Sequence, residues 1–287
     1  MSLKHIVAIA GGGPEDLQTL GFAAWLAAQH DSTVDILPAY PDTAIDMVTL
    51  GMTLGASLSR QAIEELAAAD RELHGRVEAA ARKAAGAADV VFGPGEGAPR
   101  MVLTERGLRP SLSLARAVTL SDLVVIGQDY TTGAGRDGEL LGQTLLHHRA
   151  PTLIARGEPD SLAGPAAIAW DGSAQAGRAV RNALPLLAMA SGIHILQCVN
   201  SLDSRTTDPD IDRLNAYLKA HGVGVGVPVM LEGPDEGAVL IAAAESRGAG
   251  LFVAGAYGHS RLREVVFGGA TRSFLRDAEG PSLLLAN

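Results

Sequence analysis

The sequence predicts an α/β protein made of two doubly wound, open, parallel sheets, one in each half of the chain. Three observations lead to this fold class. Short apolar segments recur in the same order in both halves, each is bounded by Gly, Pro or Asp, and stretches with helical periodicity lie between them. Such alternation of strands and helices is typical of parallel sheets with helices on both faces.

The recurring segments establish an internal repeat. Each is a short apolar run, as expected for a strand buried on both faces of a parallel sheet. The four pairs are HIVAIAGGG (5–13) with AAIAWDGS (166–173), STVDILPAY (32–40) with SGIHILQCV (191–199), SDLVVIGQDY (121–130) with AGLFVAGAYG (249–258), and APTLIAR (150–156) with GPSLLLA (280–286).

Amphipathic stretches between these segments predict the helices. Apolar residues fall on one helical face from 174 to 190, and a longer stripe runs from Leu58 to Ala84 in the first half. That stripe and the Gly/Pro stretch at 93–100 account for most of an insertion in the first half. A short linker, 157–164, whose Gly and Pro residues disfavour helix and strand, separates two predicted domains, residues 1–157 and 165–287. Because the linker is short, we expect the two domains to pack together as an intrachain pseudo-dimer.

The composition excludes several classes of partner. The chain has 287 residues, a net charge of −9 and 4% aromatic residues, which argues against nucleic acid as a ligand. The apolar run at the N-terminus is too short for a signal-peptide core, and no stretch approaches the roughly 18 apolar residues of a membrane span. The single cysteine, Cys198, is interpreted as a core residue. We therefore expect a cytoplasmic protein without a membrane partner.

A glycine-rich stretch follows the predicted fourth strand of the second half. Ligands of open α/β sheets bind at the carboxyl ends of the strands, which is where this loop lies. Gly255, Gly258, Gly268 and Gly269 precede a predicted helix start, whose free amides suit phosphate, and Thr271 adds a hydroxyl. His259 in the same loop either contacts phosphate or caps the turn, and the sequence leaves both roles open.

The spacing Gly255-x2-Gly258-x9-Gly268, together with Asp171-Gly172-Ser173 after the first strand, resembles the universal stress proteins. The resemblance covers both halves, so the chain is similar to a tandem universal stress protein. It implies the adenine nucleotide alpha-hydrolase-like fold, with strand order 3-2-1-4-5 in each half. It also implies ATP or AMP, with or without Mg²⁺, as ligand, and a role in a stress response or regulation.

The resemblance assigns roles to residues of the second half. Asp171, with Gly172 beside it, would meet the adenosine, a residue near Val199 would line the adenine pocket, and Gly255, Gly258 and Gly268 would hold the phosphates. Two departures weaken this expectation. Gly269 stands where the family usually has Ser or Thr, and Tyr257 replaces a basic residue, so we expect weaker or altered nucleotide binding.

The first half departs further from the family pattern. Gly11 stands where the second half has Asp171, and the loop after the fourth strand carries Asp129, Asp137 and Glu139, which would repel phosphate. The stretch AGGGPED at 10–16 has a faint likeness to the phosphate loop of ATP pyrophosphatases but lacks its serines. We therefore expect this half to serve as a packing partner that binds no ATP.

No catalytic or metal-binding constellation is found in the sequence. Ser173 lacks a nameable partner base and is interpreted as a helix N-cap, and the eight histidines form no metal-ligand pattern. Three functions are weighed: a nucleotide-binding stress protein, which is favoured; a nucleotide-free interaction protein with an unidentified protein partner; and, third, a slow ATPase. The pseudo-dimer is also compatible with a homodimer of whole chains.

Overall fold

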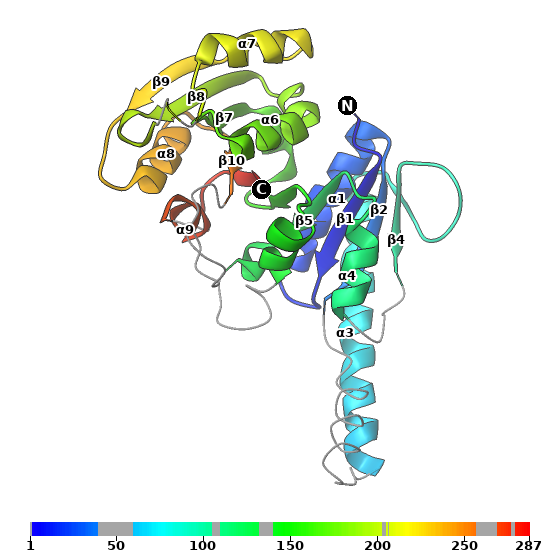
Figure 1. Cartoon of the computed structure of the whole chain (residues 1–287). Coiled ribbons are helices and arrows are strands. Elements are labelled where there is room, and N and C mark those ends of the chain that lie inside the picture. Colours follow the sequence, from blue (N-terminus) through cyan, green and yellow to red (C-terminus); the bar gives the residue numbers. More distant parts are fainter. Residues whose placement is uncertain are drawn as a thin grey trace. The chain divides into compact units, whose positions relative to one another are not determined.

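The chain is described by a computed structural model that covers residues 2–39, 60–104, 110–131, 140–202, 205, 207–256, 269–276 and 279–287. Its contacts divide into two units. The N-terminal unit is Lys4–Ser121, and the C-terminal unit comprises Asp122–Asn287 together with Met1–Leu3 (Figure 1). Both contain parallel strands connected by helices, so the predicted mixed α/β fold with a mostly parallel sheet is confirmed.

The N-terminal unit contains a parallel sheet in the order β3-β4-β2-β1. Helices α1 and α3 pack against each other, and Val77 and Ala84 on the predicted apolar stripe of α3 are buried. The elements of this unit are β1 (His5–Ala10), α1 (Asp16–His30), β2 (Thr33–Pro38), α3 (Arg60–Ala87), β3 (Val91–Phe92), β4 (Arg100–Leu103) and α4 (Pro110–Val118).

The C-terminal unit contains strands in the order β5-β6-β11-β10-β7-β8-β9. Neighbouring strands in this order are parallel except β6 and β11, which are antiparallel. Its strands are β5 (Leu123–Ile126), β6 (Thr152–Ile154), β7 (Pro165–Ala169), β8 (Gly192–Cys198), β9 (Val227–Leu231), β10 (Leu251–Gly255) and β11 (Ser282–Ala286), and its α-helices are α6 (Ala174–Leu187), α7 (Ile211–Ala220), α8 (Glu236–Glu245) and α9 (Gly269–Arg276).

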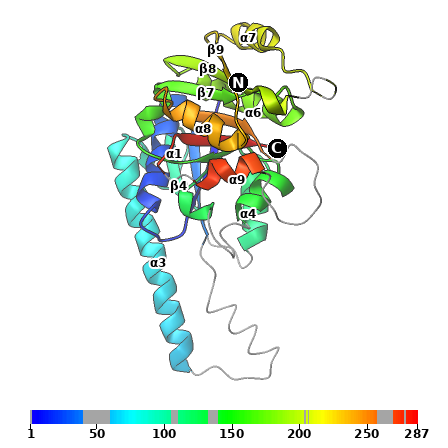
Figure 2. The same ribbon diagram turned by 90° about the vertical axis from the view of Figure 1, so that its left-hand side faces the viewer.

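The direction of the chain reverses at β7 in this sheet. From β7 the chain moves through α6 and α7 to β8 and β9 on one side, and it then returns through α8 to β10 and through α9 to β11 on the other. Because such crossovers are right-handed, the two pairs of helices cover opposite faces of the sheet. Figure 2 shows α8 and α9 next to each other. A Cβ on Gly237 of α8 would lie 2.7 Å from the carbonyl oxygen of Ala270 in α9, so only glycine permits this packing.

The strand interiors are formed by the apolar segments of the sequence repeat. Strand β11 is buried along its whole length, and β10 is buried from Leu251 to Ala254. Cys198 is buried at the end of β8, and Ser173 caps α6 by accepting a hydrogen bond from the amide of Ala176 at 3.1 Å. Both residues therefore have the structural roles that the sequence predicts. None of the described helices has the length and apolar character needed to cross a membrane.

The segment predicted as a linker is an ordered part of the C-terminal unit. It contains a 3₁₀ helix, Pro159–Ala163, whose Leu162 side chain is fully buried. The carbonyl of Ser161 packs so closely on Gly250 that a side chain there would collide with it. The division between the two units falls at residue 121 rather than in this segment, because β5 and β6 join the C-terminal sheet through β11.

A buried arginine fastens these strands to α9. Arg156, directly after β6, is 2% exposed. Its Nε donates to Oε1 of Gln128 at 2.8 Å, its Nη2 donates to the carbonyl of Phe274 at 2.9 Å, and its Nη1 reaches the carbonyl of Pro281 at 3.4 Å. Gln128 donates in turn to the carbonyl of Leu275 at 2.9 Å. A cation suits the last turn of a helix, where free carbonyls and the helix dipole attract positive charge.

Replacing Arg156 by Met should destabilise the protein by about 3 kcal/mol or more, because several buried acceptors would lose their donor. Chemical unfolding followed by circular dichroism measures this change in the free energy of unfolding. Arg272→Met, on the exposed side of α9, serves as the control and should change it by less than about 0.5 kcal/mol. Equal effects of the two substitutions would show that the Arg156 contacts contribute nothing specific.

Candidate functional site

The candidate site lies where the carboxyl ends of β7, β8 and β10 meet. The register pairs Ala169 of β7 with Leu196 of β8, and the amide of Trp170 donates to the carbonyl of Leu196 at 2.9 Å. Asp171 and Val199 therefore follow neighbouring strands at the same edge of the sheet. This edge includes the point between β7 and β10 where the chain direction reverses, which is the usual ligand position in open α/β sheets.

Asp171 begins a tight turn into α6. Its Oδ1 accepts a hydrogen bond from the amide of Ser173 at 2.8 Å, and the turn is completed by Gly172 with φ of 73°. This positive φ favours glycine over other residues. Asp171 is half-buried, and its Oδ2 has no hydrogen-bond donor among the described residues. The turn therefore leaves one carboxylate oxygen free to accept a hydroxyl.

The turn at Gly172 packs against the loop that precedes α7. Any side chain at Gly172 would collide with the backbone of Asp208, whose amide donates to the carbonyl of Gly172 at 3.3 Å. The buried side chain of Gln197 holds the same loop by donating to the carbonyl of Pro209 at 2.7 Å. Sequence reasoning missed Gln197, because one amide in an apolar strand gives no signal until its partner is known.

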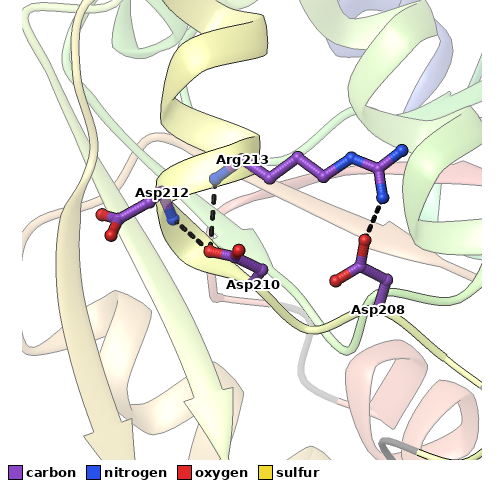
Figure 3. Close-up of polar contacts among 4 residues, drawn as sticks. All are labelled: Asp208, Asp210, Asp212 and Arg213. Atoms are coloured by element: carbon purple, nitrogen blue, oxygen red, sulfur yellow. Dashed lines mark hydrogen bonds and ion pairs between the residues drawn. The ribbon is translucent and has the colours of Figure 1, made fainter.

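The loop carries two carboxylates, Asp208 and Asp210, and Figure 3 shows their contacts with the start of α7. Arg213 of α7 forms an ion pair with Asp208, and Asp210 caps α7 by accepting from the amide of Asp212 at 2.8 Å. Arg213 thus neutralises one of the acidic charges closest to Gly172. Among the described residues, no group of three or more His, Cys, Asp or Glu could hold a metal ion.

Gly255 at the end of β10 lies against the first turn of α6. A Cβ at this position would lie 2.6 Å from the amide nitrogen of Ala176 and 2.8 Å from the carbonyl carbon of Gln175. Glycine is therefore required for packing as well as being suited to a nucleotide loop. The contact brings Gly255 and the Asp171 turn together at the amino end of α6.

The predicted loop residues Gly258, His259 and Gly268 lie outside the described residues. Gly269 is the first residue of α9, and a Cβ there would have no neighbour within 4 Å. Thr271 is only 4% exposed, so its side chain is largely inside the unit. A hydrogen bond connects α9 to α8. The Ser273 hydroxyl of α9 donates to Asp235, the N-cap of α8, at 3.1 Å.

Asp235 also caps α8, accepting from the amide of Ala238 at 3.1 Å. This amide, assisted by the Ser273 hydroxyl and by Arg276, holds the pKa of the Asp235 carboxyl below its usual value. The carboxylate is therefore charged at neutral pH and can link the two helices.

The corresponding loop of the N-terminal unit is arranged differently. After β1, the amides of Gly11 and Gly12 donate to Oδ1 and Oδ2 of Asp16 at 3.0 and 2.7 Å. Asp16 is 4% exposed, and burial raises the pKa of its carboxyl although these amides and Arg76 act in the opposite direction. An internal carboxylate thus occupies two amides that would otherwise be available to an anion.

A family model matches the C-terminal part of the chain. Residues 165–285 match the model of the universal stress protein family. Comparison with curated protein sequences gives no significant match. The family match covers the C-terminal β7–β11 segment, which carries the turn at Asp171.

Solved structures share the fold along the whole chain. A universal stress protein from Archaeoglobus fulgidus DSM 4304 is 14% identical with a TM-score of 0.68, and the match covers 100% of this chain and 97% of that one. A functionally unknown protein from Pseudomonas aeruginosa PAO1 is 12% identical with a TM-score of 0.54, covering 99% and 92%. A putative universal stress protein from Pseudomonas aeruginosa UCBPP-PA14 is 13% identical with a TM-score of 0.54, covering 99% and 93%.

The two glycines on either side of the loop should respond differently to substitution. Gly255→Ala should destabilise the protein by about 1–3 kcal/mol, because the new methyl group meets the backbone of α6. Gly269→Ala should be neutral or stabilising by up to about 1 kcal/mol, because its methyl group enters open space and alanine favours a helix. Chemical unfolding of both variants measures the difference; a Gly255→Ala variant as stable as Gly269→Ala would refute the close contact.

Asp16 should give the stability of the protein a specific pH dependence. Because folding raises the pKa of this carboxyl above 3.8, its contribution to the free energy of unfolding is greatest below that pH and is lost as the pH rises through the folded value. Asp16→Asn does not titrate. The stability of the wild type minus that of Asp16→Asn should therefore decrease from about pH 4 to pH 7.

Urea unfolding at several pH values measures this difference. The exposed acid Asp212 provides the control, since Asp212→Asn removes one carboxylate without touching the buried loop. If the difference in free energy of unfolding between the wild type and Asp16→Asn instead increased with pH, the hydrogen bonds from the amides of Gly11 and Gly12 would outweigh the desolvation of the carboxylate.

Proposed function

We propose that residues 165–287 bind an adenine nucleotide, ATP or AMP, at the carboxyl ends of β7, β8 and β10. In this proposal the protein acts in a stress response or in regulation as a nucleotide-binding protein of the cytoplasm. The observation that carries the proposal is the Asp171–Ser173 turn, which meets Gly255 at the reversal point of a segment that matches the universal stress protein family.

The free oxygen of Asp171 provides the acceptor for the adenosine part of the ligand. Its Oδ1 is held by the amide of Ser173, which fixes the orientation of the carboxylate. Ribose hydroxyls are donors that a fixed carboxylate can accept, and a hydrogen bond to a charged group is worth about 1.5–3 kcal/mol. Val199, directly after β8, would line the pocket for the base.

The phosphates would face the amino end of α9. The first turn of a helix presents free amides and partial positive charge. Gly269 keeps its amide but contributes no hydroxyl, and Thr271 is largely buried, so the phosphates depend on main-chain donors. Mg²⁺ would be bound chiefly through the phosphates, since it retains several waters and uses few protein ligands.

We also propose that the chain is a tandem of two related domains, residues 1–157 and 165–287, arranged as a pseudo-dimer. The antiparallel pairing of β6 with β11 supports this arrangement, because each is the last strand of one copy of the sequence repeat. Leu153 pairs with Leu284 at the centre of the junction. The N-terminal domain would bind no nucleotide, since Asp16 already occupies its glycine amides.

A nucleotide-free interaction protein is the second candidate function. The burial of Thr271 and the absence of a hydroxyl at Gly269 favour it, because both remove contacts that would hold a phosphate. A slow ATPase is the third candidate, and no observation on this site favours it.

Calorimetric titration of the full chain with ATP and Mg²⁺ tests the proposal. Saturable binding of one nucleotide is expected, and Asp171→Ala should weaken it at least tenfold. Asp212→Ala removes an acid of α7 outside the turn and should leave it unchanged. The absence of heat at millimolar nucleotide, or equal binding by wild type and Asp171→Ala, would refute the site.

Gly269→Ser provides a gain-of-function test of the same site. The position has open space and no positive φ, so a serine hydroxyl can be added at the amino end of α9. One extra donor to phosphate should strengthen binding about threefold to tenfold. Gly269→Ala, which adds a methyl group without a donor, should show no gain. Equal gains in both variants would attribute the effect to helix stability.

A further inference from the structure

The N-terminal unit contains a cavity that has no part in the proposed nucleotide site. Its volume is about 440 Å³, and it is a depression open to solvent, since the Arg82 side chain that lines it is 64% exposed. The floor is formed by the end of β3, the loop after it and the last residues of β4, and one wall is formed by α3. The cavity thus lies at the carboxyl ends of two parallel strands, a position where α/β sheets commonly bind ligands.

The loop after β3 is held in shape by one arginine. Arg100 of β4 donates to the carbonyls of Gly93 at 2.8 Å, Pro94 at 3.2 Å and Glu96 at 3.0 Å. Its Nε donates to the carbonyl of Gly97 at 3.2 Å. Four loop carbonyls therefore surround one guanidinium, and the cavity wall that contains Gly93 and Pro94 is fixed before any ligand binds.

The cavity is lined by two charged side chains of α3, Glu78 and its ion-pair partner Arg82. The Nε and Nη2 of Arg82 both donate to Oε1 of Glu78, at 3.2 and 2.6 Å, and its guanidinium lies over the ring of Phe92 at 4.8 Å from the centroid. These two contacts orient the guanidinium. Its Nη1 has no hydrogen-bond partner among the described residues, so the end formed by Nη1 and Nη2 is left available.

The rest of the cavity is largely apolar. Phe92, Val102 and Leu103 are only half-buried, and all three line it. Strands β3 and β4 are paired only from Val91 to Phe92, so the outer edge of β4 beyond Met101 has no neighbouring strand in the described part of the unit. When a ligand covers apolar surface that is partly open to water, the complex is stabilised by about 25 cal/mol per Å² of surface covered.

We propose that this cavity binds a small organic acid with an apolar body. The carboxylate of the ligand pairs with the free end of the Arg82 guanidinium, a geometry in which arginine binds carboxylates through two parallel hydrogen bonds. The apolar body covers Phe92, Val102 and Leu103.

Three probes of matched shape test the charge preference: 3-phenylpropionate, 3-phenylpropanol and 3-phenylpropylamine. Each is titrated into the full chain labelled with ¹⁵N, and the amide resonances of Gly93 and Leu103 report occupancy of the cavity. The acid should saturate both resonances with at least tenfold higher affinity than the alcohol or the amine. Equal affinities for the acid and the alcohol, or shifts confined to other amides, would overturn the proposal.

Substitutions on α3 test the role of the guanidinium. Arg82→Gln should lower the affinity for 3-phenylpropionate at least tenfold, while Arg71→Gln, an exposed arginine of the same helix outside the cavity, should leave it unchanged. Circular dichroism confirms that both variants are folded. Arg82→Lys keeps the charge but loses the planar fork, so an intermediate affinity is expected. Unaltered binding by Arg82→Gln would overturn the assignment.

Discussion

The antiparallel contact between β6 and β11 determines how the C-terminal unit is built. Parallel sheets of this kind have an exposed edge at their last strand, and an exposed edge is a liability unless it is paired or covered. Here β6 and β11 cover each other's edges, with Leu153 opposite Leu284. Arg156 reinforces the contact with hydrogen bonds to carbonyls at the end of α9 and after it. The helix that follows the glycine-rich loop is therefore fixed at its carboxyl end by a residue of the first repeat.

The loops that follow β1 and β7 are arranged in different ways. In the N-terminal unit, Asp16 satisfies the amides of Gly11 and Gly12 internally, at the expense of burying a carboxylate. In the C-terminal unit, Asp171 stands before the turn, is held by one amide and keeps an oxygen free. The position of one aspartate, before or after the glycines, decides how many amides of its own loop the carboxylate accepts from.

The fold class could be predicted from the sequence because strands and helices leave local patterns. Buried parallel strands appear as short apolar runs, and the stripe that predicts α3 is a simple periodicity. The role of Ser173 as an N-cap could be predicted for the same reason, since a cap involves residues three positions apart. These features depend on neighbours in the chain, which a sequence displays directly.

Contacts between distant residues could not be predicted in this way. Gly255 was interpreted as a phosphate-binding residue, and only the structure shows that its missing side chain makes room for the backbone of α6. The hydrogen bond from Gln197 to Pro209 and the burial of Thr271 likewise depend on how separate elements pack. A glycine required by packing and a glycine required by a ligand look the same in a sequence, so the resemblance to a family motif alone assigns neither role.

The insertion in the first repeat gives that half a different surface from the second. It contributes α3, β3 and the loop held by Arg100, and these elements form the walls of the cavity around Arg82. The second repeat has no counterpart of β3 among its described residues, so its β9 is the outermost strand, with Val227 and Met230 exposed. The same half that closes its glycine loop with Asp16 therefore carries a preformed cavity at another part of its sheet.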